Sequence, residues 1–311
     1  MYSLSEWVLG STQELEISES RFQRIKEAKK LLSEGLAIEE KWEILVSNYV
    51  DLESDCLSAT TSHMLFSEQP YEAFFKNTVL FNKRLVNLLT ASRLYSEQIE
   101  SHIGRCFPDS SQIKDEVKSW KSKAYDSMFE YRFMEALRNY AQHRGLAVHQ
   151  ITVGGSWTDV EREDAELRNG IKLFTHKSKV EDDSAFKKTV VKEMPEKVDL
   201  MLMVRVYISE LSKIHLKARE LLKDRLAEAR EVISSSIDEY VELSNSSEDK
   251  KVLGLHAIHW DESVKPKKAI EKQSLLLEWD DMRVALTKKN GSLGNLKKWV
   301  VTSSLDYKKK F

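Results

Sequence analysis

The chain has few of the residues that break helices or cross-link loops. Four prolines and ten glycines are spread over 311 residues, and the only two cysteines are Cys56 and Cys106. Two isolated cysteines cannot form a disulfide framework, and no Cys/His spacing matches a zinc site. Because proline and glycine are the usual helix breakers, their scarcity favours long uninterrupted helices. We therefore predict a mainly all-α protein of the reducing cytoplasm that uses no metal and no other cofactor.

Long hydrophobic runs and a one-sided charge are also lacking. Nowhere do about 18 apolar residues follow one another, and residues 1–22 lack a basic region followed by an apolar run. We expect neither a membrane span nor an export signal. The 48 basic and 50 acidic residues leave a formal net charge of -2, so no global field attracts nucleic acid or a membrane surface. Binding driven by charge must come from local patches.

Several segments carry apolar residues at helical spacing. They span residues 19–33, 37–54, 70–105, 113–143 and 195–243, with Gly35 as a break between the first two and Pro195 opening the last. The turn at 106–112 contains Ser110 or Ser111 as a helix cap. The segment that begins at Pro70 predicts a helix of roughly 33 residues. It should pair with the helix at 113–143 as a long antiparallel helical hairpin within a helix bundle.

The pattern changes after Gly145. Short β-leaning runs predict an inserted hairpin or long loop at about 147–192. The polar segment 244–251 is the most linker-like. We therefore predict a helical bundle over 1–243 and a helical, basic C-terminal extension over 252–311, with helices near 264–289 and 295–303.

The C-terminal extension has a local excess of positive charge. From residue 264 to the end, twelve basic residues face five acidic ones. This excess could bind a phosphate backbone, or it could simply be the solvated face of surface helices. His256 and His259 have a spacing that could hold a metal on a helix, but no third ligand is anchored elsewhere, so we predict no metal site.

The stretch "EALRNYAQHRGLAVH", residues 135–149, crowds nitrogen side chains at the end of a predicted helix. At about 100° per residue, aromatic and aliphatic side chains occupy one half of this helix. The other half is polar and carries Arg138, Asn139 and His143. Gly145 follows as the expected left-handed residue after the helix, which places His143 in the last turn, where an imidazole suits proton transfer near neutral pH.

The helical spacing also predicts how these side chains meet. Asn139 and His143 are four residues apart and lie one above the other, whereas Arg138 lies about 140° away from His143. A single helix therefore does not bring Arg138 and His143 to one ligand. The arrangement favours a composite site at the interface of a homodimer.

The run Arg138-Asn139-x-x-x-His143 resembles the signature of HEPN-superfamily ribonucleases, in which an arginine, a polar residue and then a histidine form the active site. The resemblance implies a helical bundle that dimerises through this helix. It also implies metal-independent RNA cleavage, in which the 2′-hydroxyl attacks the adjacent phosphate. Carried over to this chain, Arg138 would stabilise phosphate charge, Asn139 would position the substrate or His143, and His143 would move the proton.

Members of the HEPN superfamily are toxins, abortive-infection proteins and other defence or RNA-processing factors, so the resemblance suggests RNA as substrate and an antitoxin or sensor as a regulatory partner. Near the signature, we expect four residues to bind substrate: Arg132, Gln142, Arg144 and His149. The alternative hypothesis is a catalytically silent helical scaffold that binds RNA or a protein partner. In that case His143 only caps the helix C-terminus and Arg138 is solvated.

Overall fold

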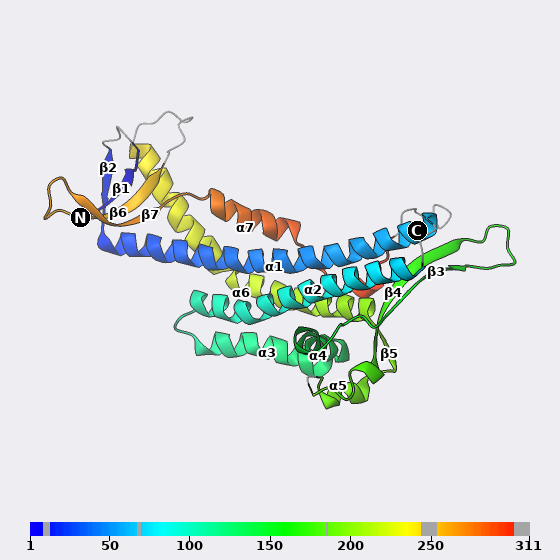
Figure 1. Ribbon diagram of the computed structural model, residues 1–311. Coiled ribbons are helices and arrows are strands. Elements are labelled where there is room, and N and C mark those ends of the chain that lie inside the picture. The colour runs from blue at the N-terminus through cyan, green and yellow to red at the C-terminus, as the bar shows by residue number, and fades with distance from the viewer. Residues whose placement is uncertain (9–12, 67–69, 185, 244–253, 302–311) are drawn as a thin grey trace. The chain divides into compact units, whose positions relative to one another are not determined.

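The protein is described by a computed structural model that covers residues 1–8, 13–66, 70–184, 186–243 and 254–301. It is 65% helical and contains two small antiparallel sheets (Figure 1). The mainly α-helical class predicted from the scarcity of proline and glycine is therefore confirmed. None of the described helices is long and apolar enough to cross a membrane.

Four consecutive helices, α1 to α4, lie between two pairs of strands along the chain. The α-helices are α1 (Glu19–Leu65), α2 (Pro70–Cys106), α3 (Ser111–Ser127), α4 (Phe129–His143), α5 (Lys188–Glu193), α6 (Leu200–Leu243) and α7 (Glu278–Lys289). The strands are β1 (Tyr2–Glu6), β2 (Glu14–Ile17), β3 (Gln150–Trp157), β4 (Leu167–His176), β5 (Lys197–Asp199), β6 (Leu255–Asp261) and β7 (Lys268–Ser274). Two 3-10 helices, η1 (Lys177–Lys179) and η2 (Leu296–Lys298), complete the elements.

The chain forms two compact units, each assembled from separate segments. Unit 1 contains residues 1–43, 95–117 and 217–291, and unit 2 contains the rest. The long helices α1, α2, α3 and α6 each contribute residues to both units. The sequence predicted a different division, in which 1–243 and 252–311 are separate parts, whereas unit 1 combines residues from both of these parts. The predicted linker, 244–251, lies outside the described residues.

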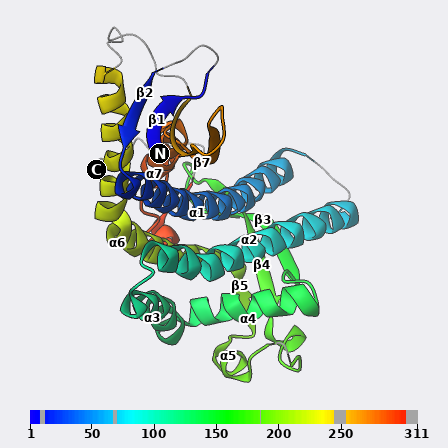
Figure 2. The same cartoon turned by 90° about the vertical axis from the view of Figure 1, so that its left-hand side faces the viewer.

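Unit 1 contains a four-stranded antiparallel sheet in the order β2-β1-β6-β7. The sheet lies beside the beginning of α1 and the end of α6 (Figure 2). Its inner face is apolar: Leu4 is fully buried, and the Tyr2 ring lies 5.2 Å from the ring of Phe22 on α1. The prediction that the C-terminal extension is helical was wrong over residues 255–274, where β6 and β7 of this sheet form instead. Of the helix predicted near 264–289, only Glu278–Lys289 forms.

The first two predicted helices are one continuous helix, α1, so the expected break at Gly35 was wrong. Gly35 lies inside the helix because another helix packs closely against it. A Cβ atom at this position would approach Leu226 Cδ2 of α6 to 2.7 Å. A glycine that allows close helix packing looks the same in sequence as one that ends a helix.

In unit 2 the predicted insertion at 147–192 contains a β-hairpin. Strands β3 and β4 pair in continuous register from Gln150↔Phe174 to Trp157↔Leu167, and β5 adds to the free side of β4. The sequence predicted that the next helix begins at Pro195. Because β5 forms first, this helix, α6, begins at Leu200. Asp199 caps it, because its carboxylate accepts the backbone N–H groups of Met201 and Leu202 at 3.0 and 3.2 Å.

The helix predicted at 113–143 is divided into α3 and α4. Met128 between them has extended backbone angles, φ -127° and ψ 122°. The guanidinium of Arg132 donates to the carbonyl oxygens of Tyr125 and Asp126, both at 2.9 Å. Because the last carbonyls of a helix have no partner within it, this arginine stabilises the end of α3.

Gly145 does not adopt the predicted left-handed conformation, since within the described chain only Gly254 and Asn295 have a positive φ. Its role is to leave room for an aromatic ring. A Cβ atom on Gly145 would lie 2.6 Å from the hydroxyl oxygen and 2.9 Å from Cζ of Tyr140. The Tyr140 ring is itself held in a T-shaped contact with Phe186, at 6.2 Å between centroids.

We predict that Gly145→Ala destabilises unit 2 by about 1–3 kcal/mol, because the added methyl group displaces a packed ring. The midpoint of urea unfolding, followed by circular dichroism, measures this loss. Gly154→Ala in β3 is the matched control, since nothing lies within 4 Å of the added Cβ. Equal midpoints for the two variants would show that Gly145 is not needed for packing.

Candidate functional site

The candidate site lies on α4, which has one buried face and one polar edge. Tyr131, Phe133, Met134, Ala136, Leu137 and Tyr140 are the buried residues. Along the polar edge, Arg138 and Asn139 are partly buried, whereas Gln142 and His143 are exposed. Phe133, Ala136, Leu137 and Tyr140 lie on the half that the helical projection predicted to be apolar, whereas Tyr131 and Met134 are buried outside that half.

Arg138 is held by three neighbours on its own helix. Its Nη1 donates to Oε1 of Gln142 at 3.1 Å, and its Nη2 donates to Oδ1 of Asn139 at 2.5 Å. Its Nε lies 4.0 Å from the carboxylate of Glu135 and has no hydrogen-bond partner among the described residues. The side chain of Arg138 is only 14% exposed. The guanidinium is thus fixed in position before any ligand binds.

Tyr207 of α6 fixes the position of Glu135. Its hydroxyl donates to Oε1 of Glu135 at 2.6 Å, and its ring packs 4.9 Å from the ring of Tyr131. Burial first, and then the negative charge of Glu135, raise the pKa of Tyr207 well above its ordinary value. The phenol therefore stays protonated and remains a hydrogen-bond donor to Glu135.

The contacts of Arg138 orient the amides of Asn139 and Gln142. Both amide oxygens accept from the guanidinium, so both amide NH₂ groups remain as donors on the polar edge of α4. A positive charge lies directly behind these donors. This arrangement suits an oxyanion such as a phosphate.

His143 is the last residue of α4 and is exposed. No hydrogen bond joins it to Arg138 in the part of the chain that the structure describes. Arg144, which follows, closes the helix with its backbone N–H on the carbonyl of Tyr140, and its side chain lies 3.6 Å from Asp183. One copy of the chain therefore presents Arg138 and His143 separately, as their five-residue spacing predicts.

The remaining predicted substrate residues are bound within the chain. Arg132 donates to Glu193 of α5 at 2.7 Å, in addition to its contacts with the end of α3. His149 accepts the backbone N–H of His176 on Nδ1 at 3.1 Å, and its ring lies 6.1 Å from the ring of Tyr140. Arg132 and His149 thus support α4 in this structure, whereas Gln142 and Arg144 are exposed.

Burial is the main cause that lowers the pKa of His149 below 6.5, and the positive charges of His176 and Lys179 act in the same direction. A hydrogen bond with the backbone of Leu146 opposes this shift. His149 therefore stays neutral in the folded protein at a pH at which the unfolded chain already binds a proton.

We predict that the free energy of unfolding falls as the pH drops below 6.5, in part because of His149. The unfolded state takes up the proton first, so it gains stability relative to the folded state. Urea unfolding at about pH 7.5 and about pH 5.5 measures how far the free energy of unfolding falls between these pH values, and His149→Gln should make this fall smaller. In His63→Gln, which removes an exposed histidine of α1, the fall should be the same as in the wild type. An equal loss in His149→Gln and the wild type would contradict the prediction.

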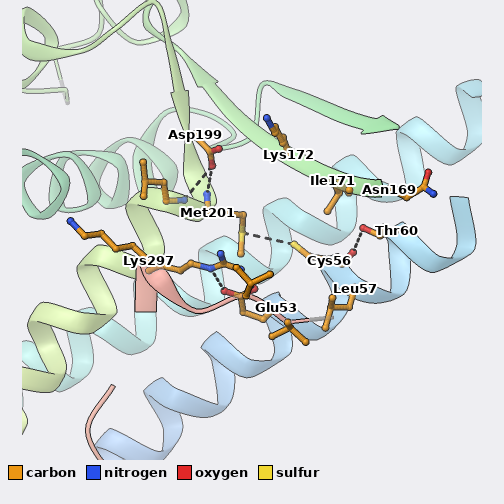
Figure 3. A pocket seen from close by; sticks show the side chains of 15 residues that line it. Glu53, Cys56, Leu57, Thr60, Asn169, Ile171, Lys172, Asp199, Met201 and Lys297 are labelled. Atoms are coloured by element: carbon orange, nitrogen blue, oxygen red, sulfur yellow. Dashed lines mark hydrogen bonds and ion pairs between the residues drawn. The ribbon is translucent and has the colours of Figure 1, made fainter. Parts of the chain in front are cut away.

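Sequence reasoning missed a pocket of about 330 Å³ in unit 2, lined by side chains of α1, β4, α6 and η2 (Figure 3). At the pocket, Arg205 donates to both carboxylate oxygens of Glu53 at 2.7 and 2.8 Å. Burial raises the pKa of the Cys56 thiol to about 12, so this cysteine is not a nucleophile. The lining residues come from distant parts of the chain, and no short motif could have revealed them.

No group of three or more histidine, cysteine, aspartate or glutamate side chains in the described part of the chain could hold a metal ion. His256 and His259 lie on strand β6 rather than on a helix, and the ring of His259 stacks on Tyr2 at 4.3 Å.

No family model, no curated protein and no solved structure matches the chain.

Proposed function

We propose that this protein is a metal-independent endoribonuclease of HEPN type with its active site on α4. The observation that carries the proposal is the hydrogen-bonded group formed by Arg138, Asn139 and Gln142. It directs two amide donors and one positive charge toward the polar edge that ends in the exposed His143. Such a group suits the negatively charged oxygens of an RNA phosphate during cleavage.

In the proposed reaction, the 2′-oxygen of a ribose forms a bond to the adjacent phosphorus, and the bond from phosphorus to the 5′-oxygen breaks. His143 removes the proton of the 2′-hydroxyl, the departing 5′-oxygen takes a proton from water, and the imidazolium then returns its proton to the solvent. Arg138 and Asn139 stabilise the charge that develops on the phosphate. The products are a 2′,3′-cyclic phosphate end and a 5′-hydroxyl end.

The proposed active enzyme is a homodimer formed through α4, in which α2 and the α3–α4 pair act as the helical hairpin of the HEPN bundle. Arg138 and His143 lie on different sides of one helix, so a second copy would complete the site. Of the four residues expected to bind substrate, the exposed Gln142 and Arg144 would contribute to RNA binding, whereas Arg132 and His149 would support α4 from within the chain. The proposed role is defence or toxin-like, in the cytoplasm, with an antitoxin or sensor as regulator.

We predict that the purified protein cleaves RNA in the presence of EDTA, and that His143→Ala or Arg138→Ala lowers the rate by about 100-fold or more. Gel separation of labelled RNA, with detection of 2′,3′-cyclic phosphate ends, measures the rate. His63→Ala removes an exposed histidine from α1 and is the matched control, with wild-type cleavage expected. Cleavage that persists in both site variants would refute the proposal, as would an intact wild-type protein that cuts no RNA, either purified or during phage infection.

We also predict that mixing the two inactive variants restores cleavage. If Arg138 of one protomer acts with His143 of the other, each mixed dimer contains one intact site and one doubly defective site. Random exchange should recover about a quarter of the wild-type rate. Recovery is measured after subunit exchange at equal concentrations. If both variants are inactive alone and stay inactive in mixed dimers, the composite site is wrong even if the enzyme is a ribonuclease.

The alternative function is a catalytically silent scaffold for a protein partner. Three exposed aromatic side chains favour this scaffold function. They lie just after the end of α1 and in the first turns of α2: Phe66 is 64% exposed, Tyr71 82% and Phe75 63%. Large exposed apolar patches usually mark interaction sites. Arg138 also has its contacts within the chain. A scaffold would show no cleavage under any condition, whereas the proposed enzyme loses cleavage only in the site variants.

A further inference from the structure

The outer face of the sheet in unit 1 carries a row of two stacked tryptophan side chains with one lysine at each end. The rings of Trp7 and Trp260 stack at 6.1 Å between centroids with an interplanar angle of 30°. Lys272 Nζ lies 3.9 Å from the centre of the Trp7 ring, and Lys267 Nζ lies 4.6 Å from that of Trp260. The row therefore runs Lys272, Trp7, Trp260, Lys267, and we call it the tryptophan row.

The sheet register places this row on the face opposite to α1. Along β1, Tyr2 and Leu4 face the core, so Ser3 and the side chain of Trp7, which follows the strand, belong to the outer face. Trp260 Nε1 donates to the hydroxyl of Ser3 at 2.8 Å, and the Trp7 backbone N–H donates to the carbonyl of Gly254 at 2.8 Å. The Trp260 ring and the backbone of Trp7 are thus held in place by hydrogen bonds.

The tryptophan row is accessible from solvent. Trp7 is 50% exposed, and Lys272 is exposed on β7. Trp260 is the aromatic partner of Trp7 within the row, and the only other group that stacks on the Trp7 ring among the described residues is the flexible Lys272 side chain, so much of the ring surface remains in water.

Positive charge is concentrated beside the rings. The loop between β6 and β7 and the start of β7 place Lys265, Lys267 and Lys268 within four residues, all of them exposed. On the same side of the sheet, Glu14 forms an ion pair with Lys267, and Glu16 of β2 is exposed. Lys268 and Lys272 take part in none of the ion pairs among the described residues.

We propose that the tryptophan row binds single-stranded RNA, with bases stacked on Trp7 and Trp260 and with phosphates bound by the neighbouring lysines. Every base has a flat π-face that stacks on an aromatic ring, and lysines beside the rings neutralise the backbone. The lysine side chains over the rings are flexible, so they can move from the ring to a phosphate as a base enters. Double-stranded RNA hides its base faces and does not fit this surface.

This inference goes beyond the proposed function, because the tryptophan row lies in unit 1 whereas α4 belongs to unit 2. It names a binding surface for RNA that needs neither His143 nor Arg138. Binding can therefore be measured when cleavage is absent.

The test uses the full chain with His143→Ala, so that no RNA is cut, and a fluorescein-labelled single-stranded oligouridylate. Fluorescence anisotropy should show that Trp7→Ala weakens binding by about 5- to 150-fold, the range expected for loss of one base stack. Trp7→Phe should recover most of the affinity. Trp157→Ala, which removes a 55% exposed tryptophan on β3, is the matched control and should bind as the parent does.

The contribution of the lysines to RNA binding is measured separately, by the dependence of the binding constant on salt. Changing both Lys268 and Lys272 to Gln should reduce the dependence of the binding constant on salt, by about 0.7 in the logarithmic slope for each lost phosphate contact. A duplex of the same length should compete poorly for the labelled strand.

Equal affinity for RNA in Trp7→Ala and in its parent overturns the inference, as does a parent that binds no RNA. If Trp7→Ala instead changes only the oligomeric mass by sedimentation, the surface is a protein interface and the inference is wrong. If the protein never cleaves RNA but binds it strongly, and Trp7→Ala weakens that binding, the inference is supported while the proposed function fails. If cleavage depends on His143 but Trp7→Ala binds RNA as its parent does, the proposed function is supported and the inference about the tryptophan row fails.

Discussion

The hydrogen bond from Tyr207 to Glu135 is the interaction on which the candidate site depends. Tyr207 is buried on α6, so its hydroxyl needs a partner inside the protein, and Glu135 of α4 supplies it. The fixed carboxylate then faces Arg138, which orients the amides of Asn139 and Gln142. Tyr207 thus positions Glu135, and Glu135 in turn helps to position Arg138. The buried hydroxyl of Tyr207 would lose its partner if α4 moved, so this bond holds α4 against α6 in one orientation.

Helical periodicity predicted the mainly α-helical class and the full length of α2, because these features depend on the local spacing of apolar residues. It failed where tertiary contacts override local signals. Gly35 continues α1 because Leu226 needs the space, and β5 forms before α6 because β4 offers it a pairing edge. The sheet of unit 1 escaped prediction because the pairing that joins its two hairpins, β1 with β6, connects segments far apart in sequence.

The candidate site was predictable to the extent that it lies on one helix. The projection of α4 separated the buried Leu137 from the polar edge and placed Arg138 and His143 on different sides. It could not identify Tyr207 as the residue behind Arg138, because the two come from helices that are distant in the chain. The same limit applies to the tryptophan row, since Trp7 and Trp260 meet only through the pairing of β1 with β6.

The segment 129–199 that follows the extended Met128 is joined to the long helices at several points. Arg132 donates to the end of α3, Glu135 accepts from Tyr207 of α6, and the backbone N–H of Val148 donates to Asn82 of α2 at 3.0 Å. The segment is therefore not a unit that can be exchanged as a whole. The mostly exposed turn between β3 and β4, residues 158–166, makes none of these contacts, so it is the place where a new loop leaves the long helices undisturbed.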